Sequence, residues 1–192
     1  VDTIETVFVD FCKNNPKYGK FGTFLTEAAS KANSAIYYTA SQNPSLEGMG
    51  TTFVGFVANN NKVTLANVGD SRAYLVSSDD IRQITVDHSL INEMVQQGRL
   101  SHKEALSHPV KNVITRALGV DNEVQCDTYS VEVKKGDYIL LCSDGLTEEV
   151  TDPEIHFEVC NNDSIEESCQ SLVNIAKARG GHDNITVVIC AF

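Results

Sequence analysis

The sequence is short of positive charge and has no long hydrophobic run. Its 192 residues include 15 lysines and arginines against 26 aspartates and glutamates, giving a net charge of -11. So acidic a chain is a poor partner for nucleic acid or for an anionic membrane. No stretch approaches the roughly 18 apolar residues that span a bilayer, and no secretory signal pattern opens the chain. We therefore expect no nucleic-acid partner and no membrane span in this segment.

The six cysteines lack the spacings of a metal-binding or disulfide framework. None lies in a C-x-x-C pair, and several sit in apolar runs, where a small buried hydrophobe is expected. This pattern argues against a thiolate zinc site and favours a reducing, cytoplasmic setting. Internal repeats and low-complexity tracts are also missing. With 42% hydrophobic residues, the length predicts a single globular domain over residues 1–192.

The chain has no initiator methionine. Apolar residues from Val1 to Phe11 already recur at helical spacing, and Pro16 ends that pattern. We expect the chain to begin inside or at the edge of a helix, as a fragment, a processed form or a trimmed version of a longer protein. A second helix, with an alanine-rich face, is predicted from about Phe21 to Gln42.

Beyond residue 50 the pattern changes to the short, β-branched segments typical of strands. Strands are predicted at residues 52–58, 62–68, 72–76 and 82–85. Their connections are short, so neighbouring strands should pair as antiparallel hairpins. On this interpretation Asp70, in the turn Gly69-Asp70-Ser71, lies at a hairpin tip.

A helical pattern interrupts the strands at about residues 87–112. Leu90, Ile91, Met94 and Val95 form an apolar stripe, and Ser101 with Glu104 fits a capping box. This insert predicts a flap over a site at the edge of a sheet, although a simple crossover fits the sequence equally well.

Two nearly continuous apolar runs occupy the last third of the chain. Residues 138–143 lack polar alternation, as in a strand buried on both faces, and Asp144-Gly145 follows where the run stops. Asp183 lies just before the second run, residues 185–192. Helices are predicted between the two runs, a short one starting at Asp152-Pro153 and a longer one at residues 163–179.

Three aspartates can meet if these strands are antiparallel neighbours. Asp144 and Asp183 would then lie at the same sheet edge, and Asp70 could reach it. Clustered carboxylates without basic partners repel, raise one another's pKa or bind a cation. Hard oxygen ligands on rigid strand ends suit Mg²⁺ or Mn²⁺. The alternative is ordinary turn chemistry, because Asp-Gly and Gly-Asp-Ser are common turn sequences.

A Ser-His-Asp hydrolase is the competing interpretation of the same residues. Ser143, His182 and Asp183 are present, but the chain has no G-x-S-x-G elbow, and Ser143 precedes the turn. His182 follows two glycines and is either an exposed loop residue or an acid or base facing a phosphate.

Five motifs, in order along nearly the whole chain, resemble those of the metal-dependent serine/threonine protein phosphatases of type 2C, and the bacterial branch is the most similar. The motifs are Met49-Gly50-Thr51-Thr52, Asn67-Val68-Gly69-Asp70-Ser71-Arg72, Asp87-His88-Ser89, Cys142-Ser143-Asp144-Gly145-Leu146 and Gly181-His182-Asp183-Asn184-Ile185-Thr186-Val187. The stretch Asn112 to Gly119 also resembles the bacterial branch.

The resemblance implies an α+β fold, a four-layer αββα sandwich of two antiparallel sheets flanked by helices. It implies two or three Mn²⁺ or Mg²⁺ ions, with Asp144 and Asp183 as ligands of the catalytic metal and Asp70 with Asp144 as ligands of an additional one. It implies that residues 87–112 are the flap. The expected reaction is hydrolysis of phosphoserine and phosphothreonine by a metal-activated water. The expected partners are phosphorylated proteins, among them a cognate kinase and its substrates.

The family's opening strands should precede Val1. They carry an Asp-rich motif, a phosphate-binding arginine, an Asp-Gly metal bridge and the general-acid histidine, and none has an equivalent here. The catalytic residues beyond the metal ligands are thus expected N-terminal of Val1, and this chain is expected to be weakly active or inactive and less stable. A non-catalytic regulatory module and a hydrolase of other phosphoesters are the alternatives.

Overall fold

The computed structural model describes residues 21–105 and 108–192. The helix predicted from Val1 to Phe11 lies outside this range. The helices are α2 (Phe21–Ser41), the short 3₁₀ helix η1 (Pro44–Leu46), α3 (Leu90–Gln96), α4 (His102–Ala105), α5 (Asp144–Thr147), α6 (Asp152–Asn161) and α7 (Ile165–Ala178). The strands are β1 (Phe53–Asn59), β2 (Lys62–Val68), β3 (Arg72–Val76), β4 (Ile81–Gln83), β5 (Asp127–Glu132), β6 (Tyr138–Cys142) and β7 (Val187–Ala191).

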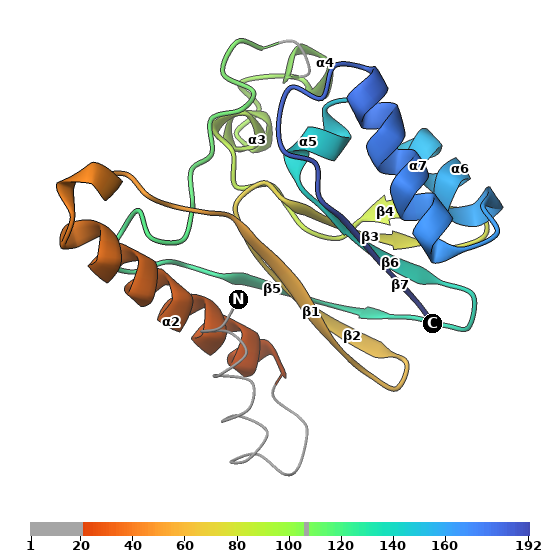
Figure 1. The fold of residues 1–192 in the computed structure, drawn as a ribbon, viewed down its shortest axis with the longest axis horizontal. Coiled ribbons are helices and arrows are strands. Elements are labelled where there is room, and N and C mark those ends of the chain that lie inside the picture. The colour runs from red at the N-terminus through yellow and green to blue at the C-terminus, as the bar shows by residue number, and fades with distance from the viewer. Residues whose placement is uncertain (1–20, 106–107) are drawn as a thin grey trace. The chain divides into compact units, whose positions relative to one another are not determined.

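The strands form two sheets, of order β1-β2-β5 and β4-β3-β6-β7 (Figure 1). In the second sheet every pairing is antiparallel. Two antiparallel sheets with flanking helices confirm the α+β class. No helix in the described part of the chain is both long and apolar enough to cross a bilayer.

The described residues group into two compact units. The first contains the residues up to Val57 together with Thr64–Asp70 and Asp87–Tyr129. The second contains Ala58–Val63, Ser71–Val86 and Ser130–Phe192. Asp70 belongs to the first unit, whereas Asp144 and Asp183 belong to the second. A single domain over residues 1–192 stays a prediction.

The predicted hairpin at Gly69-Asp70-Ser71 is wrong. Strand β2 belongs to the three-stranded sheet and β3 to the four-stranded one, so the two strands do not pair. Asp70 therefore lies in a connection between sheets and not at a hairpin tip. The physical reason is that the polar groups of Gly69 bond to Asn67 and His88, and Gly69 itself adopts φ +108. Short loops of this composition look alike in sequence whether or not the flanking strands pair.

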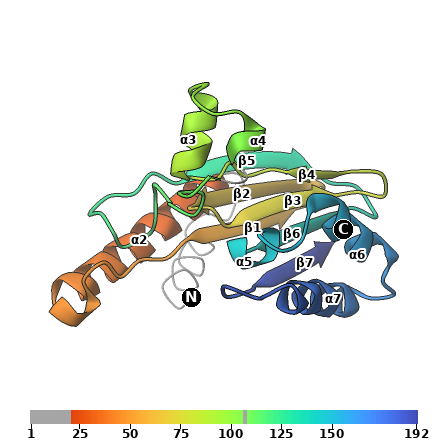
Figure 2. The same cartoon turned by 90° about the horizontal axis from the view of Figure 1, so that it is seen from above.

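Strand β6 is the centre of the second unit. It hydrogen-bonds to β3 on one side and to β7 on the other, and Ile139, Leu140 and Cys142 are buried. Helices α6 and α7 cover the face that carries Leu140, and Figure 2 shows α7 running alongside β7. The core residues on this face are Tyr74, Val76, Leu140, Cys142, Leu146, Val150, Ile155, Val159, Leu172 and Ala176. The buried strand predicted from the continuous apolar run is therefore confirmed.

Helix α2 packs its alanine-rich face inside the first unit, as predicted. Ala28 and Ala29 are fully buried, in clusters that include Ala66 and Val68 of β2. Asn33, only 1% exposed, anchors the next turn of the helix. Its Nδ2 donates to the carbonyls of Asp121 and Asn122, and its Oδ1 accepts from the N–H of Gly119 at 2.7 Å.

Replacing Asn33 by Ala should destabilise the protein by about 3 kcal/mol, because a buried side chain that makes three hydrogen bonds is lost and each is worth about 1 kcal/mol. Chemical denaturation of the purified chain measures the change. Asn161→Ala is the matched control, since the Asn161 side chain is exposed and donates only to the Phe157 carbonyl. A loss equal to that of the control would contradict the anchoring role.

Candidate functional site

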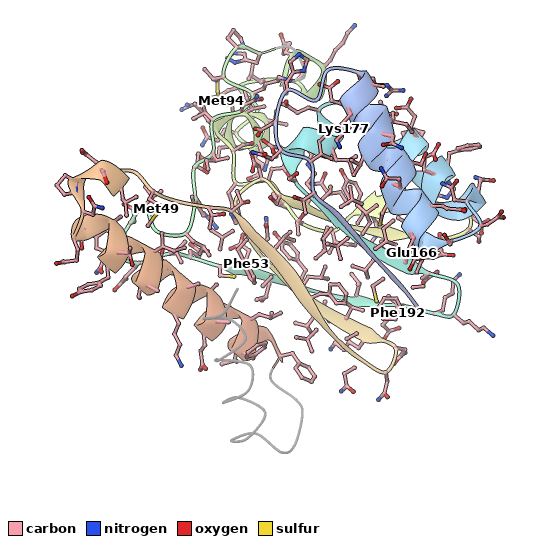
Figure 3. All side chains as sticks on the ribbon, in the orientation of Figure 1. Met49, Phe53, Met94, Glu166, Lys177 and Phe192 are labelled. Carbon is pink, nitrogen blue, oxygen red and sulfur yellow. The ribbon has the colours of Figure 1, made fainter. Side chains whose placement is uncertain are left out.

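The pairing of β6 with β7 brings Asp144 and Asp183 to the same edge of the sheet. Cys142 is opposite Val187 in the antiparallel register. Asp144 follows Cys142 by two residues, and Asp183 precedes Val187 by four, so both leave the sheet at the same end. The antiparallel pairing of these two strands, which the sequence prediction for Asp144 and Asp183 assumed, is therefore present. Figure 3 labels Lys177 at the end of α7 that leads into the Asp183 loop, and Phe192 at the opposite end of β7.

Asp144 lies neither in a strand nor in an isolated turn. It is the first residue of α5, whose N-cap is Ser143. The half-turn from strand into helix points the chain away from the sheet at the residue that carries the carboxylate. Gly145 and Leu146 behind it are buried. Asp144 is consequently held between a buried strand and a buried helical turn.

Ser143 hydrogen-bonds the end of β6 to the residues just before β7. Its N–H donates to the Thr186 carbonyl at 3.2 Å, and its Oγ accepts from the Thr186 N–H at 3.0 Å. The same hydroxyl donates to the Asn184 carbonyl at 2.8 Å. Both functions of the hydroxyl are thus structural, which argues against the Ser-His-Asp interpretation. Ser143, the residue before Asp144, is thus bonded to Asn184, the residue after Asp183.

Gly145 allows the Asp183 loop to approach the start of α5. A Cβ atom on Gly145 would lie 2.5 Å from the Asn184 carbonyl oxygen and 3.3 Å from the Asp183 carbonyl carbon. The first of these distances is far shorter than a van der Waals contact, so no side chain fits without moving backbone. The Asp-Gly dipeptide, which the sequence could only assign to a turn, therefore packs one aspartate loop against the other.

The surroundings of Asp144 disfavour its charged form. Partial burial raises the pKa of Asp144, and the negative charge of Asp183 adds to the rise, while the Gly145 N–H bonded to Oδ1 at 2.8 Å opposes it. Asp183 is exposed, and its Oδ1 accepts from the Asn184 N–H at 2.6 Å. Among the described residues no ion pair neutralises either group.

This pair fits a hard divalent cation. Mg²⁺ is commonly bound through one or two carboxylates, with waters completing the coordination. A cation would also offset the burial and the negative charge of Asp183, which together raise the Asp144 pKa. The residues that the structure covers contain no group of three or more His, Cys, Asp or Glu side chains able to hold an ion. Asp144 and Asp183 would therefore supply part of a ligand set. The inclusion of Asp70 stays a prediction, because it belongs to the other unit.

A network of charged residues holds the loop that contains Asp183. The sequence did not predict this network. His182 Nδ1 lies 2.8 Å from Glu149 Oε1, and the His182 side chain is 74% exposed. Arg179, at the end of α7, donates to the Glu149 carbonyl and forms a bidentate ion pair with Glu154. Glu154 also completes the capping box of Thr151. The only sequence signal for this network is the spacing Thr151-x-x-Glu154.

The Arg179–Glu154 pair predicts a pH-dependent contribution to stability. Hydrogen bonds from Arg179 hold the pKa of Glu154 well below its usual range. A carboxyl with a lowered folded pKa stabilises the fold above its unfolded pKa, about 4.3, and loses that contribution as pH falls. Glu154→Gln should therefore lower the Tm at pH 7, and the difference from the original chain should begin to narrow below about pH 4 and keep narrowing as the pH falls towards the folded pKa of Glu154. Glu166→Gln, on an exposed helix position, is the control and should show little change. A Tm gap that does not depend on pH would contradict the assignment.

Comparison with known proteins agrees with this geometry. The family described as Protein phosphatase 2C matches residues 8–185, and the chain belongs to that family. It is 40% identical over 167 residues to the serine/threonine phosphatase stp of Listeria innocua, covering 87% of this chain and 66% of that protein. It is 40% identical over 148 residues to the protein phosphatase PhpP of Streptococcus pneumoniae, covering 77% and 60%. The chain thus spans about two thirds of the length of such relatives.

Solved bacterial structures share the fold. The serine/threonine phosphatase Stp1 of Staphylococcus aureus superposes with a TM-score of 0.85 at 37% identity, covering 89% of this chain and 67% of that one. PstP of Mycobacterium tuberculosis gives a TM-score of 0.89 at 34% identity, covering 100% and 80%. A catalytic domain of PstP in complex with two manganese ions gives 0.83 at 33% identity, covering 98% and 78%. The resemblance to the bacterial branch is confirmed.

Proposed function

We propose that this chain belongs to a metal-dependent protein phosphatase that hydrolyses phosphoserine and phosphothreonine. The observation that carries the proposal is the β6–β7 register, which places Asp144 and Asp183 at one sheet edge. Membership of the phosphatase 2C family and similarity to serine/threonine phosphatases support it.

Asp144 and Asp183 would hold Mn²⁺ or Mg²⁺ with Asp70 as a further ligand. A bound divalent ion supplies positive charge that acidifies water and offsets the charge of the phosphoryl group. The residues of this chain provide the support. Ser143 joins the two strand ends, and Gly145 permits the close approach of the Asp183 loop. A net charge of -11 repels phosphorylated substrates at long range. Cations bound at this sheet edge would be needed to make the local electrostatic potential positive.

The proposed substrates are phosphorylated proteins, including a cognate serine/threonine kinase and the proteins that it modifies. The described residues of the segment 87–112 include the helices α3 and α4, in agreement with the helical insert expected there. We propose that this insert is the flap that controls substrate access. The location of further catalytic residues before Val1, and a cytoplasmic setting, stay predictions.

The test is hydrolysis of a phosphothreonine peptide, measured with Mn²⁺ and again with a chelator. It should be run on the 192-residue chain and on any longer product of the same gene. Turnover that requires Mn²⁺ supports the proposal, and turnover only in a longer product also assigns the missing catalytic residues to the added segment. Metal-dependent hydrolysis of nucleotides in preference to the phosphopeptide would favour a different phosphoesterase. No metal-dependent turnover in any form would favour a non-catalytic binding module.

A further inference from the structure

A buried histidine connects two motifs at the residue that precedes Asp70. His88 is 5% exposed and belongs to the first compact unit, as do Gly69 and Asp70. The Gly69 N–H donates to His88 Nδ1 at 3.0 Å, and the His88 N–H donates to the Gly69 carbonyl at 3.0 Å. His88 thus hydrogen-bonds to the peptide groups on both sides of Gly69, and the second of these joins Gly69 to Asp70.

The Gly69 carbonyl accepts a second bond, from Nδ2 of the fully buried Asn67 at 3.1 Å. The conformation itself requires glycine. Gly69 has φ +108, and a Cβ atom there would lie 2.4 Å from Thr52 Cγ2. A glycine is also the residue with the most freedom to move, so the direction of the Asp70 backbone depends on these hydrogen bonds.

The contact of His88 Nδ1 with Gly69 selects one tautomer of the neutral ring. Because Nδ1 accepts a hydrogen bond from Gly69, the neutral ring carries its proton on Nε2. That nitrogen donates a hydrogen bond to Asp127 Oδ2 at 3.1 Å, and Arg116 Nη1 lies 3.3 Å from it. Arg116 donates to the other oxygen of Asp127, Oδ1, at 3.1 Å. Arg116 orients Asp127, and Asp127 selects the ring form that can receive the Gly69 N–H.

His88 also lies at the base of the proposed flap. The Thr115 N–H donates to the His88 carbonyl at 2.8 Å, and the Leu90 N–H donates to the Val113 carbonyl at 2.9 Å. Ser89 and Ile114 form an antiparallel bridge between these bonds. The two ends of the segment 87–112 therefore pair with each other next to His88, the residue that hydrogen-bonds to Gly69.

We propose that His88, with Asp127 and Arg116 behind it, is a positioning residue that fixes the Gly69–Asp70 peptide so that the Asp70 carboxylate is presented to a divalent cation. The cation part rests on the proposed function, whereas the positioning part depends only on the first unit. A histidine that merely filled the core would not bond to both peptide groups of one glycine with its ring and its backbone.

The first measurement is amide hydrogen exchange at Gly69 in metal-free protein, followed by NMR. His88→Leu removes the ring acceptor and should speed Gly69 exchange at least about tenfold relative to the amides of β2. His88→Asn keeps an acceptor near the position of Nδ1 and should restore most of the protection. Asp127→Asn, a milder change at a partly exposed residue, should give an intermediate increase. The matched control is His156→Leu, which removes a histidine bonded to the Ser77 carbonyl in the second unit and should leave Gly69 unchanged.

The second measurement is the Mn²⁺ dissociation constant, by calorimetry. Removing a residue that orients a metal ligand typically weakens metal binding about 10- to 100-fold. His88→Leu and Asp70→Asn should each weaken Mn²⁺ binding by at least about tenfold, and the double variant no more than Asp70→Asn alone, because both changes remove the same interaction. The His156→Leu control should bind Mn²⁺ normally.

Two results would overturn the inference. One is unchanged Gly69 exchange in both His88→Leu and Asp127→Asn. The other is a double variant whose loss of Mn²⁺ affinity equals the product of the two single losses, which would make the effect of His88 independent of Asp70. If Gly69 exchange rises as expected but Asp70→Asn binds Mn²⁺ normally, His88 still positions the peptide, and the metal-ligand role of Asp70 in the proposed function is wrong.

Discussion

Asp144→Asn is expected to reduce Mn²⁺-dependent hydrolysis of a phosphothreonine peptide by about 10³-fold. A metal ion contributes several kcal/mol of charge stabilisation in such reactions, and each 1.36 kcal/mol corresponds to a factor of about ten. The amide keeps the shape of the side chain and can still accept from the Gly145 N–H. What is lost is a negative charge beside Asp183. Initial rates across a Mn²⁺ titration, in the longest active form, measure the effect.

The same substitution should leave the metal-free chain at least as stable as before. Partial burial and the charge of Asp183 both raise the Asp144 pKa, so the ionised carboxylate is unfavourable without a cation. A group whose folded pKa is raised in this way opposes folding at neutral pH, and a neutral amide removes that opposition. The Tm without metal should therefore rise or stay constant, while Mn²⁺ no longer raises it. Asp163→Asn, an exposed carboxylate next to the Ser164 cap of α7, is the control and should retain the Mn²⁺ response. A full Mn²⁺ response in Asp144→Asn would contradict the site.

Gly145→Ala should lower the free energy of unfolding by about 3 kcal/mol, at the upper end of the usual cost of overpacking. The added methyl group would lie 2.5 Å from the Asn184 carbonyl oxygen and 3.0 Å from its carbon, and neither belongs to a movable side chain. The Asp183 loop must shift, which would also strain the bonds of Ser143 to Asn184 and Thr186. We therefore expect Mn²⁺ affinity to fall together with stability, as measured by denaturation and calorimetry.

Gly136→Ala provides the comparison for that experiment. Gly136 has φ +93, but a methyl group added there would meet no atom within 4 Å, so the substitution adds backbone strain of about 1 kcal/mol without a clash. It should lower stability slightly and leave Mn²⁺ binding intact. Equal effects of the two substitutions on Mn²⁺ binding would show that Gly145 has no special role at the site.

The elements of the second unit are predictable because their signals are local and strong. The apolar run at residues 138–143 predicts a buried strand, and Asp152-Pro153 and Gly180-Gly181 mark helix ends close to those observed. The meeting of Asp144 and Asp183 needs only one further assumption, the antiparallel pairing of two strands, and the register satisfies it.

Other features could not be predicted, because they depend on contacts between residues distant in the sequence. Nothing in Gly69-Asp70-Ser71 distinguishes a hairpin from a passage between sheets, since the deciding bond comes from His88, 19 residues away. The sequence suggests a turn former at Gly145, whereas its role is set by the backbone of Asn184. The bond between His182 and Glu149 likewise spans 33 residues. The family resemblance identifies the motifs but does not explain why His88 or Gly145 stands in them.

The register of β6 and β7 also sets the order in which the protein can fold. Helices α5, α6 and α7 lie between these strands, so the pairing closes a segment of roughly forty residues, which is slow compared with forming local helices. Helices α6 and α7, which pack on each other, can form before β7 docks. A nascent chain that ends before β7 would then fold part of its core before Asp144 and Asp183 are brought to the same sheet edge.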